Sequence, residues 1–174
     1  LMVNDKEAFN AIIKLILAKG VKNYLILTGK DSTDLGQKLG YCGADLMLYA
    51  QMLGLNTWFV GGTFNRKTTS KAVDGGKVVG VIAIGYGVTQ GVPHKTKKIA
   101  DVSSYVGVAP EWFKKGVNAA LLAPTALAKQ AFMIKGEGNK VTLSCDNGIF
   151  TDPDYGLVKY HFEVGAGKDN FQWV

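Results

Sequence analysis

The sequence predicts an α+β fold in which helices and strands pack in layers. Four or five short apolar runs have the length of strands, and longer stretches have the apolar spacing of helices. The two kinds do not alternate in the strict order that a parallel βαβ sheet requires, which favours the α+β class. With 174 residues, 47% of them hydrophobic, the chain can bury a substantial core and stays within the usual length of one domain.

The first half is expected to begin with a helix over residues 5–17, where apolar side chains recur at steps of three and four. The short apolar run 23–28 has the length of a buried strand. Residues 31–34 offer cap side chains for a second helix, which should end near Leu53, before Gly54. The latter half of this helix is apolar on nearly every side, so we expect it to be buried all round.

Two further strands are expected at residues 57–60 and 78–84. Gly61 and Gly62 end the first of them in a turn, and the polar residues 65–77 are expected to form an exposed excursion. A glycine-rich segment, GYGVTQG, follows the second strand and leads into the basic loop 94–98.

In the second half, the spacing after Pro110 predicts a helix that ends before Pro124. The remaining expected elements are a helical turn at 125–130, a strand pair at 132–135 and 140–144 around a turn at 136–139, a helix from about 153 to 163, and an edge strand at 170–174.

Composition and charge exclude several classes of function. Lys14, Lys19 and Lys22 interrupt the only apolar stretch that approaches the roughly 20 residues of a membrane helix. The chain opens without the regions of a signal peptide, which favours a cytoplasmic protein. A net charge of +6 is compatible with nucleic acid, but the basic residues are scattered and no RNA-binding aromatic motif is present. The mean hydropathy of +0.09 favours a homodimer that buries part of the surface.

The sequence offers few groups for protein-based catalysis. Cys42 and Cys145 lack the spacing of a metal or redox site, and the burial habit of cysteine favours a structural role for both. His161, between two aromatic residues, is more typical of a packing residue than of a ligand or an acid. Ser103 and Ser104 lack the context of a nucleophile. We therefore predict no metal site and no catalytic side chain.

Four segments resemble the nitroreductase family, and more closely a branch in which one chain carries two related halves. They are GYCG at 40–43 leading through LGLNTWFVGG at 53–62, GYG at 85–87 with KTK at 95–97, AALLAPTAL at 119–127, and KYHFE at 159–163. Family members place the APT-type segment near the start, whereas here it follows the GYG strand. This order fits a tandem arrangement in which 23–87 resembles the later part of one half and 119–144 the earlier part of another.

The resemblance implies a nitroreductase-like layered fold with a central, mostly antiparallel sheet flanked by helices. It also implies one domain over residues 1–174, with possible halves at 1–100 and 101–174. FMN is the implied cofactor and NAD(P)H the implied electron donor. Hydride would pass through the flavin to a small-molecule acceptor such as a nitroaromatic or a quinone, without any protein acid or nucleophile.

The resemblance assigns cofactor-binding roles to two pairs of residues. Lys95 and Lys97 match the basic pair that contacts the flavin phosphate, and lysines two apart in an extended loop point the same way. The alternative for this pair is a solvated run of charge. Gly61 and Gly62 match the strand end whose backbone amides pass near the reactive edge of the flavin, where glycine permits close approach. A simple tight turn is the alternative.

Pro124, Thr125 and Ala126 match the segment that forms an apolar wall beside the flavin. The family usually continues with Asn at the position of Ala128 and Gln at that of Lys129, so only Gln130 remains of the polar part of this segment.

The sequence also departs from the family in its charged residues. The Arg-Arg-Ser-x-Arg segment that normally opens family members and supplies arginines to the flavin phosphate is absent, and Arg66 is the only arginine in the sequence. Ala44 replaces an acidic residue of the branch. Either residues that precede Leu1 are missing, or the protein binds flavin poorly. The second possibility leads to an alternative function, a degenerate, non-catalytic ligand-binding protein with a flavin fold. A third is an anion-binding protein that uses the basic loop for another phosphate ligand.

Overall fold

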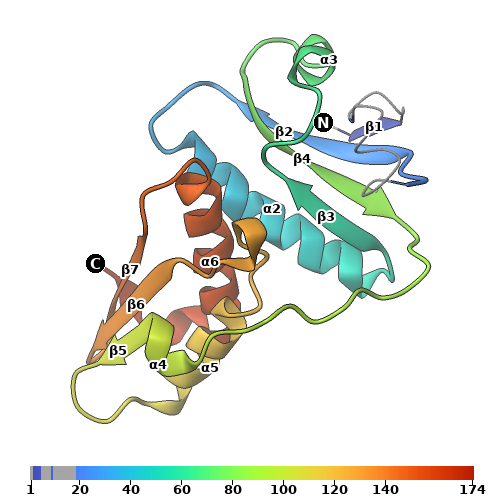
Figure 1. Cartoon of the computed structure of the whole chain (residues 1–174). Helices are drawn as coiled ribbons and strands as arrows, with labels where there is room; N and C mark the ends of the chain where they lie inside the picture. The colour runs from blue at the N-terminus through green and yellow to red at the C-terminus, as the bar shows by residue number, and fades with distance from the viewer. Residues whose placement is uncertain (1, 5–8, 10–18) are drawn as a thin grey trace. The chain divides into compact units, whose positions relative to one another are not determined.

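The computed structural model describes residues 2–4, 9 and 19–174 (Figure 1). The expected helix over 5–17 falls almost wholly outside these residues. The chain divides into two compact units, Leu1–Val92 and Pro93–Val174, each with its own four-stranded sheet. The mixture of helices and strands in both units confirms the α+β class. The strands are shared between two sheets rather than gathered in one.

The sheet of the first unit is antiparallel throughout, in the order β1-β2-β4-β3. Its strands are β1 (Met2–Asn4), β2 (Asn23–Gly29), β3 (Asn56–Val60) and β4 (Lys77–Gly85). β4 pairs on both sides, so its residue Ile82 lies opposite Leu25 on one neighbour and Phe59 on the other. The three strands predicted within residues 23–84 are confirmed.

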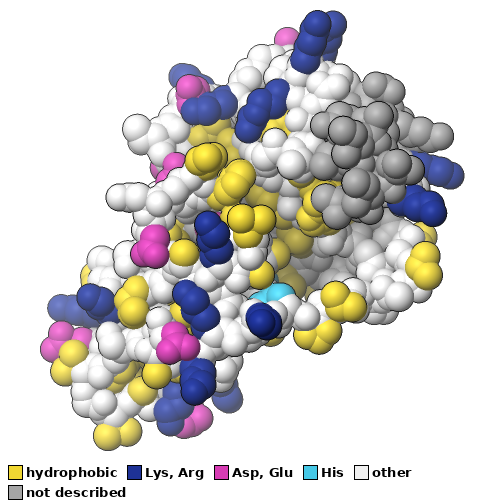
Figure 2. All heavy atoms as spheres, viewed as in Figure 1, with side chains coloured by type: hydrophobic (Ala, Val, Ile, Leu, Met, Phe, Trp, Pro, Cys, Tyr) yellow, Lys and Arg dark blue, Asp and Glu magenta, His cyan; other side chains and the backbone are white. Residues whose placement is uncertain are grey.

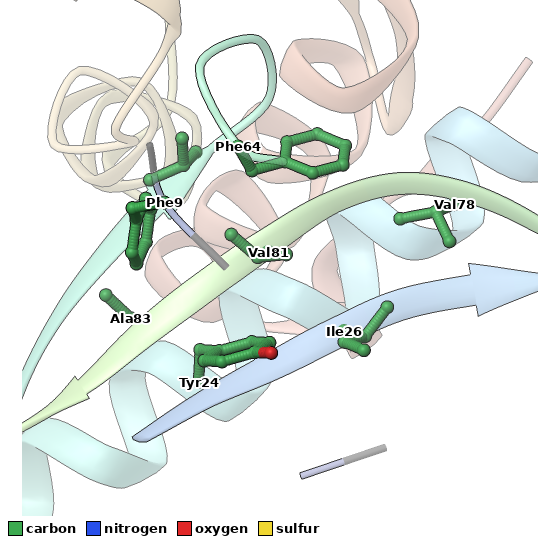
Figure 3. Packing of buried hydrophobic residues seen from close by; sticks show 8 residues of the cluster. Phe9, Tyr24, Ile26, Phe64, Val78, Val81 and Ala83 are labelled. Carbon is green, nitrogen blue, oxygen red and sulfur yellow. The ribbon is translucent and has the colours of Figure 1, made fainter. Parts of the chain in front are cut away.

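One face of this sheet carries a hydrophobic core (Figure 3). Successive residues of a strand point to opposite faces, so Tyr24 and Ile26 on β2 share this face with Val81 and Ala83 on β4. All four are less than 5% exposed. The buried cluster comprises Phe9, Tyr24, Ile26, Val60, Phe64, Val78, Val81 and Ala83.

Helix α2 (Leu35–Met52) covers the other face of the sheet (Figure 1). It approaches closely at Gly43, where a Cβ atom would lie 3.2 Å from the Phe59 ring. Gly54, with φ 75°, follows the end of the helix as expected. The predicted burial on every side is wrong, because four of the five buried residues of the helix are glycine or alanine, and several larger side chains of its latter half are exposed. The exposed side chains are Leu46, Tyr49, Met52 and Leu53, at 44–83% of their surface.

The expected exposed excursion between β3 and β4 contains a short helix, α3 (Arg66–Lys71). The Asn65 side chain caps it by accepting a hydrogen bond from the backbone N–H of Thr68 at 3.2 Å. Thr69 is fully buried, and its hydroxyl donates to the Asn65 carbonyl at 3.0 Å. Most of the segment is exposed, as expected, and Thr69 is its one buried residue.

The sheet of the second unit is mixed, in the order β5-β6-β7-β8. β6 (Phe132–Glu137) and β7 (Lys140–Cys145) form the predicted antiparallel hairpin, with Gly138 at φ 56° in its turn. β5 (Ser103–Tyr105) and β8 (Gln172–Trp173) pair in parallel on the outside. β8 confirms the expected edge strand, whereas β5 and the short helix α4 (Ile99–Val102) were not expected.

Two helices pack tightly together in the second unit, α5 (Glu111–Ala120) and α6 (Thr151–Ala166). Both match predicted helices. Glycines allow the close approach: a Cβ at Gly116 would lie 2.6 Å from the Phe162 ring, and one at Gly165 would lie 2.5 Å from the Ala119 Cβ. The short helices η1 (Ala126–Ala128) and η2 (Lys168–Asn170) complete the unit.

Glu163 anchors the end of the second unit. Its carboxylate accepts a hydrogen bond from the Trp173 indole N–H at 2.9 Å and forms an ion pair with Lys168 at 3.1 Å. Because Glu163 is only 7% exposed, these two partners satisfy a largely buried charge and hold β8 near α6.

No helix in the described part of the chain has the length and apolar character needed to cross a membrane.

Candidate functional site

Gln130 is the centre of a buried hydrogen-bond network in the second unit. Its side-chain oxygen accepts from the Lys97 backbone N–H at 2.7 Å, and its amide nitrogen donates to the Leu121 carbonyl at 2.7 Å. Its own backbone N–H donates to the Thr125 hydroxyl at 3.1 Å. Gln130 is 1% exposed and joins the basic loop and the end of α5 to Thr125 within its own segment, residues 122–130, which is called the APT segment below.

Lys97 adds a further bond to this network. Its ammonium group donates to the Gln130 carbonyl at 3.0 Å, while the side chain remains exposed. One of the three ammonium hydrogens is therefore used, and the others remain available to an anion. Lys95, two residues earlier, is also exposed. Among the hydrogen bonds described, Lys97 is bonded to the APT segment and Lys95 is not.

The APT segment divides into buried and exposed residues. Thr125 is 6% exposed, and its hydroxyl faces Gln130 rather than solvent. Pro124 is exposed, and so are two residues that sequence reasoning did not select, Leu122 at 67% and Leu127 at 84%. Pro124, Leu122 and Leu127 therefore give this segment an apolar outer surface, whereas Thr125 and Gln130 hold it from within.

The backbone of this segment is strained. Leu127, Ala128 and Gln130 have φ values of 55°, 52° and 48°, in the left-handed region that residues with a Cβ seldom adopt. Such backbone persists only where surrounding bonds fix it. The bonds to Gln130 provide part of that restraint.

Asp154 fixes the other end of the same segment. Both carboxylate oxygens lie within reach of the Ala126 backbone N–H, at 3.0 and 3.1 Å, although the two residues are 28 positions apart. Burial raises the pKa of Asp154 from 3.8 to about 6, against a smaller opposing effect of the Ala126 hydrogen bond. Burial, with Asp154 and Asp146 nearby, also raises the pKa of the Cys145 thiol to about 12. Sequence reasoning missed Asp154, because an acidic residue at a helix start resembles an ordinary cap.

We expect Asp154→Asn to flatten the dependence of stability on pH. The folded pKa is raised, so the native state holds the proton more tightly and stability falls as pH rises from about 4 to about 6. After solvent screening, this loss should amount to about 1–2 kcal/mol. Urea unfolding of both proteins at several pH values checks it, since the amide still accepts from Ala126 but cannot ionise. If stability depended on pH equally in the two proteins, Asp154 would not be the group responsible.

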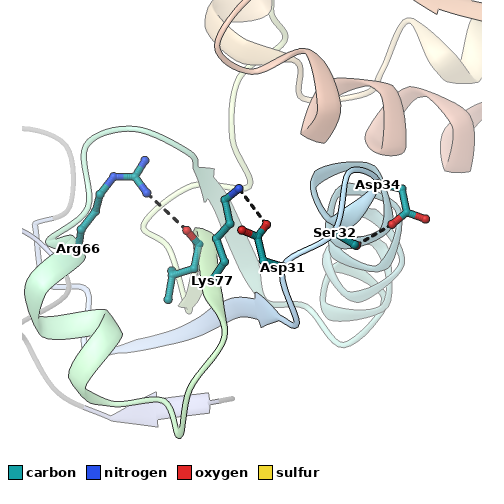
Figure 4. Close-up of polar contacts among 6 residues, drawn as sticks. Asp31, Ser32, Asp34, Arg66 and Lys77 are labelled. Carbon is teal, nitrogen blue, oxygen red and sulfur yellow. Dashed lines mark hydrogen bonds and ion pairs between the residues drawn. The ribbon is translucent and has the colours of Figure 1, made fainter.

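Gly61 and Gly62 lie in the first unit, directly after β3. Arg66 contacts this turn, because its guanidinium donates to the Gly61 carbonyl at 3.4 Å. It also donates to the Val78 carbonyl at 3.4 Å, the bond drawn from Arg66 in Figure 4. It also lies 4.6 Å from the centre of the Phe64 ring. The Gly61 carbonyl and the Gly62 N–H belong to one trans peptide and point in opposite directions. Arg66 therefore favours an orientation in which the Gly62 N–H faces away from it.

The remaining reactive residue types are mostly engaged in packing. His161 is 7% exposed, its Nδ1 lies 2.8 Å from the Leu157 carbonyl, and burial lowers its pKa. Its surroundings agree with a packing role. Cys42 is exposed on α2, so the expectation that both cysteines are buried is wrong. Within the described residues, no group of three or more His, Cys, Asp or Glu side chains could hold a metal ion.

Charge is distributed rather than concentrated. Lys and Arg side chains are scattered among acidic and hydrophobic ones on the face shown in Figure 2. On this face, the lysines do not form the broad basic surface that a polyanion requires.

Comparison with known proteins identifies the family. The family described as "Putative TM nitroreductase" matches residues 1–166, which is most of the chain. The chain belongs to this nitroreductase family. No curated protein sequence matches the chain significantly.

The fold of this family member is similar to a crystal structure from Thermotoga maritima described as a "putative nitroreductase". The two are 20% identical, with a TM-score of 0.68 over 88% of this chain and 64% of the other. At that identity the similarity shows the fold alone. The family member described here spans 64% of the length of that structure.

Proposed function

We propose that the protein is an FMN-dependent oxidoreductase that passes hydride from NAD(P)H through the flavin to nitroaromatics, quinones or similar acceptors. Membership of the nitroreductase family supports an oxidoreductase. The observation that carries the proposal is the Gln130 network, because it holds a lysine-bearing loop against an apolar, outward-facing segment. A flavin phosphate and a flavin ring require one cationic and one apolar surface of this kind.

The residues of the second unit fit the cofactor. Lys95 and Lys97 are exposed cations in an extended loop, and Lys97 retains donors after its bond to Gln130. Pro124 and Leu127 expose uncharged, apolar side chains. In the proposal, the lysines bind the phosphate, while Pro124 and Leu127, with the backbone of Ala126, pack against the ring and exclude water from it. Thr125 and Gln130 position these groups from inside.

In the first unit, Gly61 and Gly62 supply backbone amides without side chains that would block approach. The bond from Arg66 to the Gly61 carbonyl orients the peptide, so the Gly62 N–H points away from the guanidinium, and we propose it as a hydrogen-bond donor to a ligand.

FMN, when bound, supplies the redox chemistry by taking up and releasing hydride. The chain's residues bind, orient and tune it. Such a scheme requires no side chain as acid or nucleophile.

We expect the double variant Lys95→Gln, Lys97→Gln to bind FMN at least about tenfold more weakly than the parent protein, because two charge-assisted phosphate contacts are lost. Glutamine keeps much of the length of the side chain. Fluorescence titration with FMN measures the affinity. Lys98→Gln, which removes one charge from the same loop, is the control and should change the affinity less than twofold.

The thermal midpoint of each variant separates binding from folding, since Lys97 also bonds to Gln130. Unchanged FMN affinity in the double variant would remove these lysines from the site. Equal losses in the double variant and the Lys98 control would indicate a general charge effect instead.

The alternative function is a non-catalytic flavin-fold ligand-binding protein. Two observations favour it: Ala128 occupies the position of the family's Asn, and both ends of the Gln130 amide are already bonded within the protein. An anaerobic visible spectrum distinguishes the two functions. FMN that binds and is bleached by NADPH supports the oxidoreductase, whereas bound FMN that NADPH does not bleach supports the alternative.

A further inference from the structure

The first unit contains an open groove of about 570 Å³ at one end of its sheet. The groove lies where β2 and β3 begin and where β4 ends. Its volume falls within the range of small-molecule sites. We infer that this groove binds a small, planar aromatic anion. The inference concerns a different site from the flavin contacts proposed above and does not depend on them.

The charge of the groove selects an anion. Lys19 and Lys22 line it and are both exposed, on either side of a turn at Gly20 with φ 78°. None of the fifteen described residues that line the groove is acidic. Two ammonium groups without a neighbouring carboxylate in the lining attract negative charge and repel cations.

The floor of the groove selects a planar aromatic group. Trp58 lines it, and the Phe9 ring stacks on Trp58 with centroids 6.0 Å apart and planes 9° apart. This stacking supports the indole in a fixed orientation. Tyr86, 87% exposed, lines the groove from the end of β4. Flat aromatic side chains with apolar neighbours favour a ligand that can lie against them.

The wall that carries Tyr86 is fixed in advance of binding. The Asn56 side chain accepts from the Gly87 N–H at 2.8 Å and donates to the Thr89 carbonyl at 2.9 Å, which holds the segment after β4 against the start of β3. A Cβ at Gly85 would meet nothing within 4 Å, so the backbone there opens onto free space. A preformed wall lowers the entropic cost of binding.

The groove is separate from the turn at Gly61 and Gly62. The groove is lined by residues at the start of β3, whereas Gly61 and Gly62 follow the end of that strand. A strand of five residues spans about 16 Å. Two sources of a planar aromatic anion are distinguishable by experiment: an aromatic carboxylate, represented by 1-naphthoate, and a nucleoside monophosphate, represented by AMP.

The test is calorimetric titration of the full chain with 1-naphthoate and with AMP, combined with NMR detection of the indole N–H signals. We expect at least one probe to bind with a Kd below about 1 mM and to shift the Trp58 signal. The signals of Trp112 and Trp173, in the second unit, serve as internal references. Whichever probe binds more tightly identifies the source of the anion.

Two variants test the location. Lys19→Gln with Lys22→Gln should weaken binding about fivefold to tenfold, while Lys67→Gln with Lys71→Gln, an equal loss of charge on α3, should leave it within twofold. Gly85→Val should abolish binding, because its side chain enters open space and leaves the fold intact. Failure of both probes to bind at 5 mM (about five times the expected limit) would overturn the inference. Equal binding of neutral naphthalene-methanol or adenosine, or equal effects of both lysine pairs, would also overturn it.

Discussion

Gly165→Ala is expected to destabilise the protein by about 2–3 kcal/mol, although alanine is the better helix former. Gly165 lies within α6, where an added Cβ would sit 2.5 Å from the Ala119 Cβ and 2.6 Å from the Lys115 carbonyl oxygen. Both atoms belong to α5, so relief requires the two helices to separate. Helix propensity alone would predict a gain of about 1 kcal/mol, and the sign of the effect therefore distinguishes packing from propensity.

Urea unfolding of the parent and the variant measures this effect. Gly148→Ala is the matched control, because a Cβ there would meet only the Thr151 hydroxyl, at 3.8 Å. We expect the control to stay within about 0.5 kcal/mol of the parent. A stabilised Gly165 variant would show that α5 and α6 are not packed as closely as described.

The second large effect is expected from Gln130→Ala, with a loss of about 2–4 kcal/mol. The substitution leaves the Lys97 N–H and the Leu121 carbonyl without their side-chain partner in a site that is 1% exposed. It also creates a cavity beneath a segment with three left-handed residues. Because Lys97 is then held only through the Gln130 backbone, the affinity for FMN should fall together with stability.

Gln130→Glu refines this test. The carboxylate still accepts from the Lys97 N–H, but it places an oxygen against the Leu121 carbonyl where the parent has a donor. At neutral pH we expect Gln130→Glu to destabilise the protein as much as Gln130→Ala does. Its stability should recover at lower pH, as the glutamate is protonated and can donate to the Leu121 carbonyl. Lys129→Ala, at the exposed neighbouring position, is the control for unfolding. If Gln130→Ala left the free energy of unfolding unchanged, the Gln130 network could not be what restrains this segment.

Much of the fold could be predicted because local signals agree with the tertiary contacts. The apolar runs that became β2, β3 and β4 are short and bounded by turn residues, and the hairpin of β6 and β7 has a glycine at its turn. β5 was missed because Ser103–Tyr105 carries no strand pattern and is formed by parallel pairing with distant β6. The prediction that α2 is buried on every side was wrong because a hydrophobic pattern is dominated by large side chains, whereas four of the five buried residues of this helix are glycine or alanine.

The candidate site was predictable only in part. Motif resemblance selected Lys97, Thr125 and Gln130, which the structure joins by hydrogen bonds. It could not show that Gln130 is buried, or that Asp154 holds Ala126 across 28 residues. Such roles depend on tertiary distance and leave no periodic pattern in the sequence. The same holds for Leu122 and Leu127, whose exposure was not evident from their apolar character.

The two sheets differ in when they can be completed during protein synthesis. Every strand of the first sheet lies before residue 93, so its pairing requires nothing from the second unit. The second sheet depends on β8, which pairs with β7 only after residues 172–173 have left the ribosome. Domains generally fold as units in the order of synthesis. The first sheet can therefore assemble during translation, whereas the Trp173 indole reaches Glu163 only after nearly all of these 174 residues have been translated.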